Sequence, residues 1–166
     1  VREPGRNRAD ALSRGALTCE FLLGDRPAGE YLRDLQTRGE QYNGFNLICG
    51  DINRLYHYSN RGGDPVVLPA GLHGVSNHLL DTPWPKVTGG KAALAAVMAD
   101  DDFTLDAVLP VLNQREPAPD AQLPDTGVGL PMERVLSSRF IQAPFVGYGT
   151  RVSTALRVDR AGNVEW

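Results

Sequence analysis

The sequence has few of the features that mark secreted, membrane-spanning or nucleic-acid-binding proteins. It contains only two cysteines, Cys19 and Cys49, and each lies within an apolar run. We therefore expect reduced core cysteines, which argues against a disulfide-stapled domain. No apolar run approaches the roughly 18 residues of a membrane span, and no signal-peptide pattern opens the chain. A net charge of −3 gives no reason to expect a nucleic acid partner. These observations predict a cytoplasmic protein.

The frames of known metal sites are also missing. The three histidines, His57, His73 and His78, stand 16 and 5 positions apart, with no Cys-x-x-Cys or His-Glu-x-x-His pattern. Asp100 to Asp102 could attract a metal ion, but a helix cap at Asp102 or Thr104 with solvated neighbours explains them better. We expect no metal and no cofactor.

What is present is an ordinary globular composition. Apolar residues make up 42% of the 166 positions and charged residues 22%, which suits one domain over residues 1–166 with a single core. Residues 1–12 carry arginines without periodicity and are predicted as a flexible arm. Residues 115–133 hold four prolines and are predicted as a long loop, which in proteins is usually a lid, a binding segment or disordered.

Apolar periodicity and turn residues predict helices first, then strands, then helices, then a terminal hairpin. Because the helices are segregated from antiparallel strands, the order indicates a layered α+β fold. Helices are predicted over 16–23, 27–38, from Pro83 with an interruption at 88–90 and again over 92–98, and over 105–113; strands are predicted over 45–49, 54–60, 66–68, 72–76, 150–158 and 164–166.

One stretch, Gly71 to Lys91, combines features of a functional site with those of a structural turn. Gly74-Val75-Ser76-Asn77 reads as a short strand that ends in a polar turn. A helix entry follows, with Asp81 or Thr82 as the capping oxygen and prolines behind it. Composition alone leaves both interpretations of Asn77 open.

Four segments of the chain resemble, in order, those of the NRDE family, also called the transport-and-Golgi-organisation protein 2 family. The resemblance covers nearly the whole chain but only the later part of the family's sequence. The family's Met-Cys opening and Asn-Arg-Asp-Glu motif have no counterpart here. We therefore expect the C-terminal portion of a longer protein, with the missing N-terminal segment as its partner. The matching segments are Tyr42-Asn43-Gly44-Phe45-Asn46-Leu47, Ser59-Asn60-Arg61, Gly74-Val75-Ser76-Asn77 with Leu80-Asp81-Thr82-Pro83-Trp84-Pro85-Lys86 and Lys91, and Tyr148-Gly149-Thr150-Arg151-Val152-Ser153-Thr154.

The resemblance implies a four-layer αββα sandwich of the N-terminal-nucleophile (Ntn) hydrolase type, lacking its N-terminal strands in this chain. In such enzymes an N-terminal Cys attacks an amide while its own α-amine acts as base. Asn77, in a turn similar to that of the choloylglycine and penicillin-V acylases, is then the oxyanion donor; the alternative is a turn Asn that bonds its own backbone. Arg151 is the second catalytic candidate, with an edge-strand Arg in solvent as the alternative. Val1 cannot be the nucleophile, so this fragment alone is not expected to be active.

Four further residues are candidates for substrate binding. Arg139 lies in a Ser-Arg-Phe triplet similar to one in the acylases, and Trp84 could form an aromatic wall or a core anchor at the helix entry. Tyr148 precedes Arg151 in the matched segment. His78 completes the set, although the family more often has a small residue at its position.

Two functions remain open at this stage. The first is hydrolysis of amide bonds by an Ntn-type cysteine enzyme. The alternative is a non-catalytic carrier for haem or for ligands of the acyl-CoA or lipid type. Both imply a small-molecule ligand, and a homodimer is compatible with either.

Overall fold

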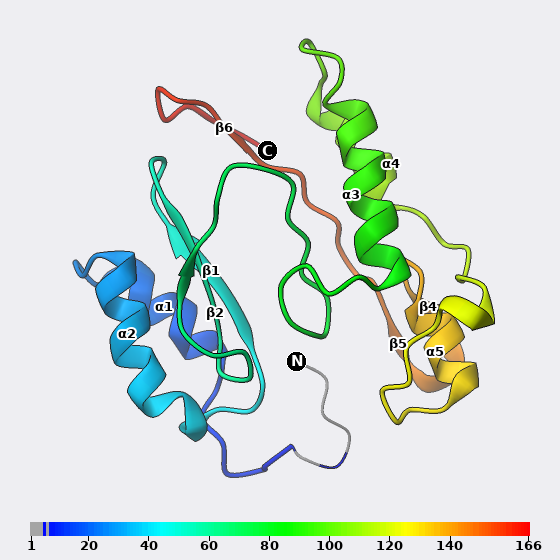
Figure 1. Ribbon diagram of the computed structural model, residues 1–166, viewed down its shortest axis with the longest axis horizontal. Helices are drawn as coiled ribbons and strands as arrows, with labels where there is room; N and C mark the ends of the chain where they lie inside the picture. Colours follow the sequence, from blue (N-terminus) through cyan, green and yellow to red (C-terminus); the bar gives the residue numbers. More distant parts are fainter. Residues whose placement is uncertain (1–4, 6) are drawn as a thin grey trace. The chain divides into compact units, whose positions relative to one another are not determined.

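The computed structural model describes residues 5 and 7–166, which form two compact units (Figure 1). Unit 1 comprises Val1–Gly71 with Val75–Leu80, and unit 2 comprises Leu72–Gly74 with Asp81–Trp166. Much of the predicted arm over 1–12 lies outside the described residues. One domain over residues 1–166 stays a prediction.

Unit 1 contains the predicted pair of helices and the predicted hairpin. Its three strands form one antiparallel sheet in the order β1-β2-β3, and the register places Ile48 opposite His57 and His57 opposite Val66. The turn residues that follow Gly50 make the short connection between β1 and β2 possible. The elements are α1 (Gly15–Leu23), α2 (Ala28–Arg38), the 3₁₀-helix η1 (Gly39–Gln41), β1 (Asn46–Gly50), β2 (Leu55–Ser59) and β3 (Val66–Val67).

The core of unit 1 lies between the helices and one face of the sheet. Tyr31, Leu32 and Leu35 of α2 are at most 1% exposed and pack with Leu17 of α1 and with Cys49 of β1. Removing such side chains from water is the main favourable term in folding. The other predicted core cysteine, Cys19, is exposed. That prediction was wrong because α1 is apolar almost all round, so periodicity could not identify its buried face.

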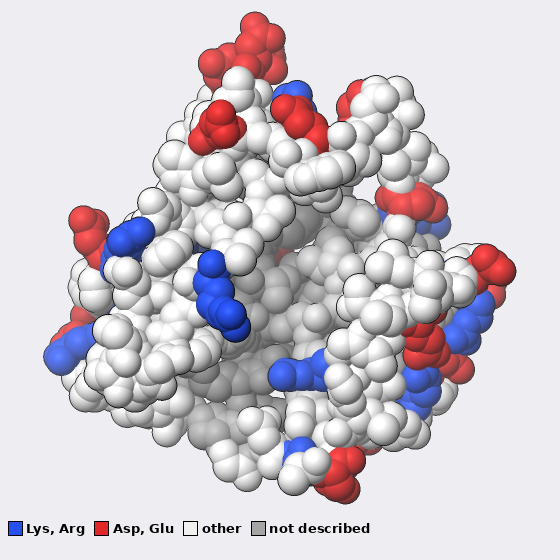
Figure 2. Space-filling view, turned by 180° about the vertical axis from the view of Figure 1, so that it is seen from behind, with Lys and Arg blue, Asp and Glu red and all other residues white. Residues whose placement is uncertain are grey.

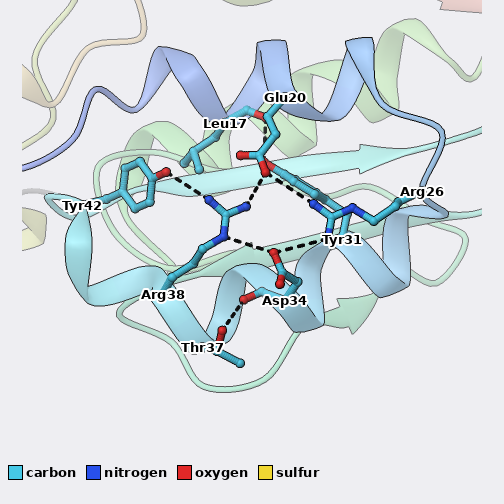
Figure 3. Close-up of polar contacts among 8 residues, drawn as sticks. All are labelled: Leu17, Glu20, Arg26, Tyr31, Asp34, Thr37, Arg38 and Tyr42. Atoms are coloured by element: carbon cyan, nitrogen blue, oxygen red, sulfur yellow. Dashed lines mark hydrogen bonds and ion pairs between the residues drawn. The ribbon is translucent and has the colours of Figure 1, made fainter.

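A charged network connects α1 and α2 at the edge of this core (Figure 3). Arg38 donates to Glu20 at 2.6 Å and to Asp34 at 3.1 Å, and its third contact is the Tyr42 hydroxyl at 3.2 Å. Beneath it the hydroxyl of Tyr31 donates to the carbonyl of Leu17 at 2.8 Å, and burial raises the pKa of Tyr31. The network joins the two helices through charge-assisted hydrogen bonds whose acidic partners remain partly exposed to solvent.

Unit 2 contains three helices and two small hairpins. Helices α3 and α4 pack alongside each other (Figure 1). Strands β4 and β5 pair with each other, as do β6 and β7, and both pairs are antiparallel. The elements are α3 (Pro85–Val97), α4 (Leu105–Leu112), the 3₁₀-helix η2 (Asp120–Gln122), α5 (Leu130–Leu136), β4 (Gln142–Ala143), the 3₁₀-helix η3 (Pro144–Val146), β5 (Tyr148–Gly149), β6 (Arg157–Val158) and β7 (Val164–Glu165).

Two predictions for α3 and the segment that precedes it were wrong. Helix α3 runs unbroken through Gly89 and Gly90, since glycine costs only about 1 kcal/mol in a helix and packing can offset that cost. Residues 72–76 form no strand. In addition, the loop predicted over 115–133 contains η2 and gives way to α5 at Leu130. The prolines of this region indicated a loop, but Pro131 occupies the first turn of α5, where proline is tolerated.

The terminal hairpin is confirmed, with strands shorter than predicted. It pairs Arg157 with Glu165 and Val158 with Val164, whereas the extended segment 151–156 belongs to no strand. The described residues thus contain five α-helices and three small antiparallel sheets, which is a mixed α and β structure. The four-layer sandwich stays a prediction. None of the helices in the described part of the chain has the length and apolar character required to cross a membrane.

Candidate ligand-binding site

Arg151 lies on a surface cleft within unit 2. The cleft has a volume of about 770 Å³, within the usual range of small-molecule sites. One wall is a face of α4 and the residues that follow it, and the other is the extended segment that begins at Arg151. The lining residues are Asp106, Leu109, Pro110, Asn113, Gln114, Arg115, Phe140, Arg151, Val152 and Ser153.

A cation–aromatic pair forms one part of this cleft. The guanidinium carbon of Arg115 lies 4.6 Å from the centre of the Phe140 ring. Arg115 also donates to the side-chain oxygens of Asn113 at 3.2 Å and Gln142 at 3.5 Å. A guanidinium above an aromatic ring keeps its edge available to a planar anion. The pair therefore offers a cation backed by an apolar surface.

The charge of the cleft is positive and incompletely balanced. Arg151 forms no hydrogen bond or ion pair with any other described residue. Arg115 has only neutral hydrogen-bond partners among the described residues, and Asp106 is the one acidic residue in the lining. Elsewhere, on the face shown in Figure 2, Lys and Arg side chains are scattered among Asp and Glu. Attraction of an anion to the cleft would therefore depend on Arg115 and Arg151 themselves.

Local sequence explains why α4 and Phe140 take these positions. Of the two predicted caps, Asp102 and Thr104, it is Thr104 that precedes α4, and its hydroxyl accepts from the Ala107 N–H at 3.4 Å. The helix ends at Leu112, and the next turn presents the Gln114 carbonyl, which accepts from the Phe140 N–H at 2.8 Å. That bond fixes the backbone of Phe140 beside the end of α4.

The depression continues along α4 toward the N-terminus of the helix. A second hollow of about 550 Å³ shares Asp106, Leu109 and Ser153 with the first. Its far end is lined by Leu105 and Trp166 together with the acidic side chain of Glu165, so it carries no arginine and has apolar surface beside one carboxylate. The two hollows together suit an elongated ligand with an anionic group at one end.

Asp81 has a different role from the predicted one. The residue before α3 is Trp84, and no side chain caps the helix there. Asp81 instead accepts three hydrogen bonds. They come from Lys91 Nζ at 2.7 Å, His73 Nδ1 at 2.7 Å and the Gly74 N–H at 2.9 Å. The bond from Lys91 is the main reason that the pKa of Asp81 is lowered to about 2; burial opposes the shift, and the bonds from His73 and Gly74 add to it. These bonds join His73, Gly74 and Asp81, which precede α3, to Lys91 within that helix.

Comparison with known proteins now decides the family. The family model described as Transport and Golgi organisation 2 matches residues 1–166. The chain belongs to the transport and Golgi organisation 2 family. It is 38% identical to the bovine transport and Golgi organization protein 2 homolog over 176 residues, which covers 98% of this chain and 63% of the relative. It is also 38% identical to the human homolog over 172 residues, with coverage of 93% and 60%, and 34% identical to the mouse homolog over 175 residues, with coverage of 96% and 62%. The chain thus spans about three fifths of the length of these relatives.

The two catalytic candidates taken from the family resemblance lie in different units. Arg151 belongs to unit 2 and Asn77 to unit 1, so their convergence stays a prediction. Asn77 is partly buried, and its side-chain amide forms no hydrogen bond with the other described residues. The backbone next to it is anchored by Asn46, whose side-chain N–H donates to the His78 carbonyl at 2.8 Å.

The four candidates for substrate binding in this family member do not line the cleft. Arg139 is partly buried and donates from Nε to the Val111 carbonyl at 2.5 Å. Trp84 is partly buried at the start of α3, as an anchor at the helix entry would be, whereas His78 and Tyr148 are exposed. The residues that periodicity missed are Arg115 and Phe140. No local sequence pattern identifies Arg115 and Phe140 as residues of a cleft. Their contact depends on the tertiary structure, which brings Phe140 next to the end of α4.

Proposed function

We propose that this chain binds a small anionic molecule with an apolar part, in the cleft beside α4, and that it acts as a carrier or binding protein. The observation that carries the proposal is the presence of Arg115 and Arg151 in one cleft, neither within 4.0 Å of a carboxylate of a described residue. Guanidinium groups left without an acidic partner are the usual receptors of carboxylates and phosphates.

The continuation of the cleft past Leu109 and Leu105 toward Trp166 supports a particular range of ligands. Acyl-CoA and related lipid anions carry phosphate or carboxylate at one end and a hydrocarbon chain at the other. Haem carries two propionates on an apolar ring. An acyl chain suits the long depression that passes Leu109 toward Trp166, since burying each methylene is worth about 0.8 kcal/mol.

The test is a titration of the chain with palmitoyl-CoA and, separately, with haemin, followed by calorimetry or by the change in haem absorbance. We expect saturable binding of at least one of them, and a loss of about tenfold in affinity for Arg115→Met and for Arg151→Met, which is the weight of one charged hydrogen bond. Binding should weaken as salt is added.

Arg134→Met is the matched control, because Arg134 belongs to unit 2, pairs with Asp120 at 2.6 Å and lies outside the cleft lining. It removes the same charge from the molecule. If Arg115→Met and Arg151→Met bind no more weakly than Arg134→Met, or if neither ligand saturates the wild-type chain, the proposal is wrong.

Amide hydrolysis is the second candidate, and one observation favours it. The partly buried amide of Asn77 has no hydrogen-bond partner among the described residues, as an oxyanion donor without substrate would have none. The reaction would need a cysteine nucleophile from outside this chain and the Ntn-type αββα sandwich that the family resemblance implies.

A full-length family member provides the test of hydrolysis. A β-lactam probe and mass spectrometry would reveal an acyl adduct on an N-terminal cysteine. Replacing the asparagine that corresponds to Asn77 with alanine should lower the rate of labelling about 100-fold, the typical weight of one oxyanion donor. Absence of any adduct on that cysteine would exclude the hydrolase and leave the carrier.

A further inference from the structure

Arg139 forms an unusual set of contacts for a charged side chain in unit 2. It is partly buried, and no carboxylate of the described residues lies within 4.0 Å of its guanidinium. Its one side-chain hydrogen bond among the described residues runs from Nε to the carbonyl of Val111 at 2.5 Å. Burial lowers the pKa of Arg139. Placing a cation there costs free energy, so the position needs a structural or functional reason.

The Val111 carbonyl belongs to the last turn of α4, where carbonyl groups have no partner within the helix. Arg139 fills that gap with a cation, which also interacts favourably with the negative end of the helix dipole. Its own backbone N–H donates to the side-chain oxygen of Gln114 at 3.2 Å, and the N–H of Phe140 donates to the Gln114 carbonyl at 2.8 Å. Two consecutive residues are therefore bonded to the end of one helix.

Helix α3 leaves room for this side chain at Gly89 and Gly90. A Cβ atom added to Gly89 would lie 3.1 Å from Nη1 of Arg139, and one added to Gly90 would lie 3.3 Å from its Cδ. Both distances are tighter than ordinary van der Waals contact. The glycine pair that the sequence presented as a helix interruption instead lets an arginine pass between α3 and the end of α4.

We propose that Arg139 is a positioning residue for the cleft rather than a ligand contact. By bonding to the end of α4 it sets the Phe140 ring under the Arg115 guanidinium, 4.6 Å away, and so fixes the direction in which Arg115 presents its charge. This inference rests on the proposed function for its effect on binding, whereas its effect on the Arg115–Phe140 pair stands by itself.

The first measurement needs no ligand. In NMR spectra the side-chain protons of Arg115 should be shifted upfield by the Phe140 ring, and Phe140→Leu supplies the value without the ring. We expect Arg139→Met to move these signals most of the way to the Phe140→Leu value. Gly89→Ala, which leaves Arg139 in place but crowds its guanidinium, should move them in the same direction by less. Arg134→Met should leave them unchanged.

The second measurement is a double-mutant cycle in ligand affinity with palmitoyl-CoA or haemin. Arg139→Met should weaken binding about fivefold in the wild-type chain and by less than twofold in the Arg115→Met chain, because Arg139 acts through Arg115. Arg139→Lys, which keeps a donor for the Val111 carbonyl, should restore most of the affinity. If Arg139 had only a structural role, Arg139→Met would still weaken binding in the Arg115→Met chain.

Two results would overturn the proposal. One is an unchanged Arg115 signal in a folded Arg139→Met or Gly89→Ala chain, whatever the binding data show. The other is an undiminished loss of affinity in the Arg115→Met background, with a smaller salt dependence, which would make Arg139 a direct ligand contact. If no ligand binds at all, the proposed function fails while the NMR measurement still decides the role of Arg139.

Discussion

Asp81 Oδ1 accepts a 2.7 Å hydrogen bond from Nζ of Lys91. The contact joins the segment ahead of α3 to the middle of that helix, and Asp81 adopts a φ of 54°, a backbone conformation that few residues other than glycine, asparagine and aspartate accept. Both residues belong to segments that resemble the family's signature. The geometry gives them a structural role in unit 2.

The carboxylate of Asp81 should make the stability of unit 2 sensitive to acid. Its folded pKa of about 2 lies below the ordinary value of about 3.9. The stabilisation is therefore fully present above about pH 4 and is lost as the pH falls toward 2. Asp81→Asn, which tolerates the same φ, should lower the free energy of unfolding by roughly 1–2 kcal/mol at pH 7. Urea denaturation at pH 7, 4 and 3 would measure this, with the difference from wild type narrowing at pH 3. Asp101→Asn, at an exposed position, is the control; an equal effect there would contradict the assignment.

The two cysteines should differ sharply in reactivity. Cys19 is exposed, whereas Cys49 is 7% exposed in the core of unit 1, and burial raises its pKa to about 11. Since the thiolate is the reactive form, iodoacetamide at pH 8 should modify one thiol of the native chain and both thiols in urea. Mass spectrometry should locate the single native adduct on Cys19, and Cys19→Ser should abolish it. Native labelling of Cys49 at a similar rate would show that the core of unit 1 is open.

Gly50 should be essential to the β1–β2 hairpin. A Cβ atom at this position would lie 2.1 Å from the carbonyl oxygen of Arg54. A change of side-chain rotamer cannot relieve this clash, because the obstructing atom belongs to the backbone. Gly50→Ala should therefore cost more than about 2 kcal/mol in unfolding free energy. Gly15→Ala, at the first residue of α1 with ordinary contacts, should be neutral or stabilising. Thermal unfolding of the two variants would distinguish these expectations, and a mild Gly50→Ala would refute the close approach.

Arg38 and Arg26 offer a matched comparison in the network of Figure 3. Both contact Glu20 and Asp34, but Arg38 does so at 2.6 and 3.1 Å with 22% of its side chain exposed, and Arg26 at 3.4 Å with 48% exposed. Exposed pairs contribute little, whereas a shielded and bonded charge contributes more. Arg38→Met should lower the unfolding free energy by about 1–2 kcal/mol and Arg26→Met by less than about 0.5 kcal/mol, as measured by urea denaturation. A reversed order would contradict this account.

Local sequence predicted the elements that have clear apolar periodicity or that are bounded by turn residues, proline or glycine. Two strand-like runs separated by turn residues predicted β1 and β2 closely, and the proline and glycine at the ends of α2 predicted that helix. Helix α5 escaped because its start lies in a proline-rich stretch, and the strand predicted over 72–76 did not form. Of the candidate site, the sequence indicated Arg151 but not Arg115 or Phe140, since no periodicity relates them.

The sequence by itself determined that this is a mixed α and β chain of the transport and Golgi organisation 2 family, because motif order and apolar periodicity are properties of the chain alone. Only tertiary structure decided which charged groups meet one another. Asp81 took Lys91 as its partner and Arg139 took a helix end, while no carboxylate of a described residue lies within 4.0 Å of the guanidinium of Arg115 or Arg151. Electrostatic interactions depend on distance and burial in space, and sequence spacing does not specify either of them.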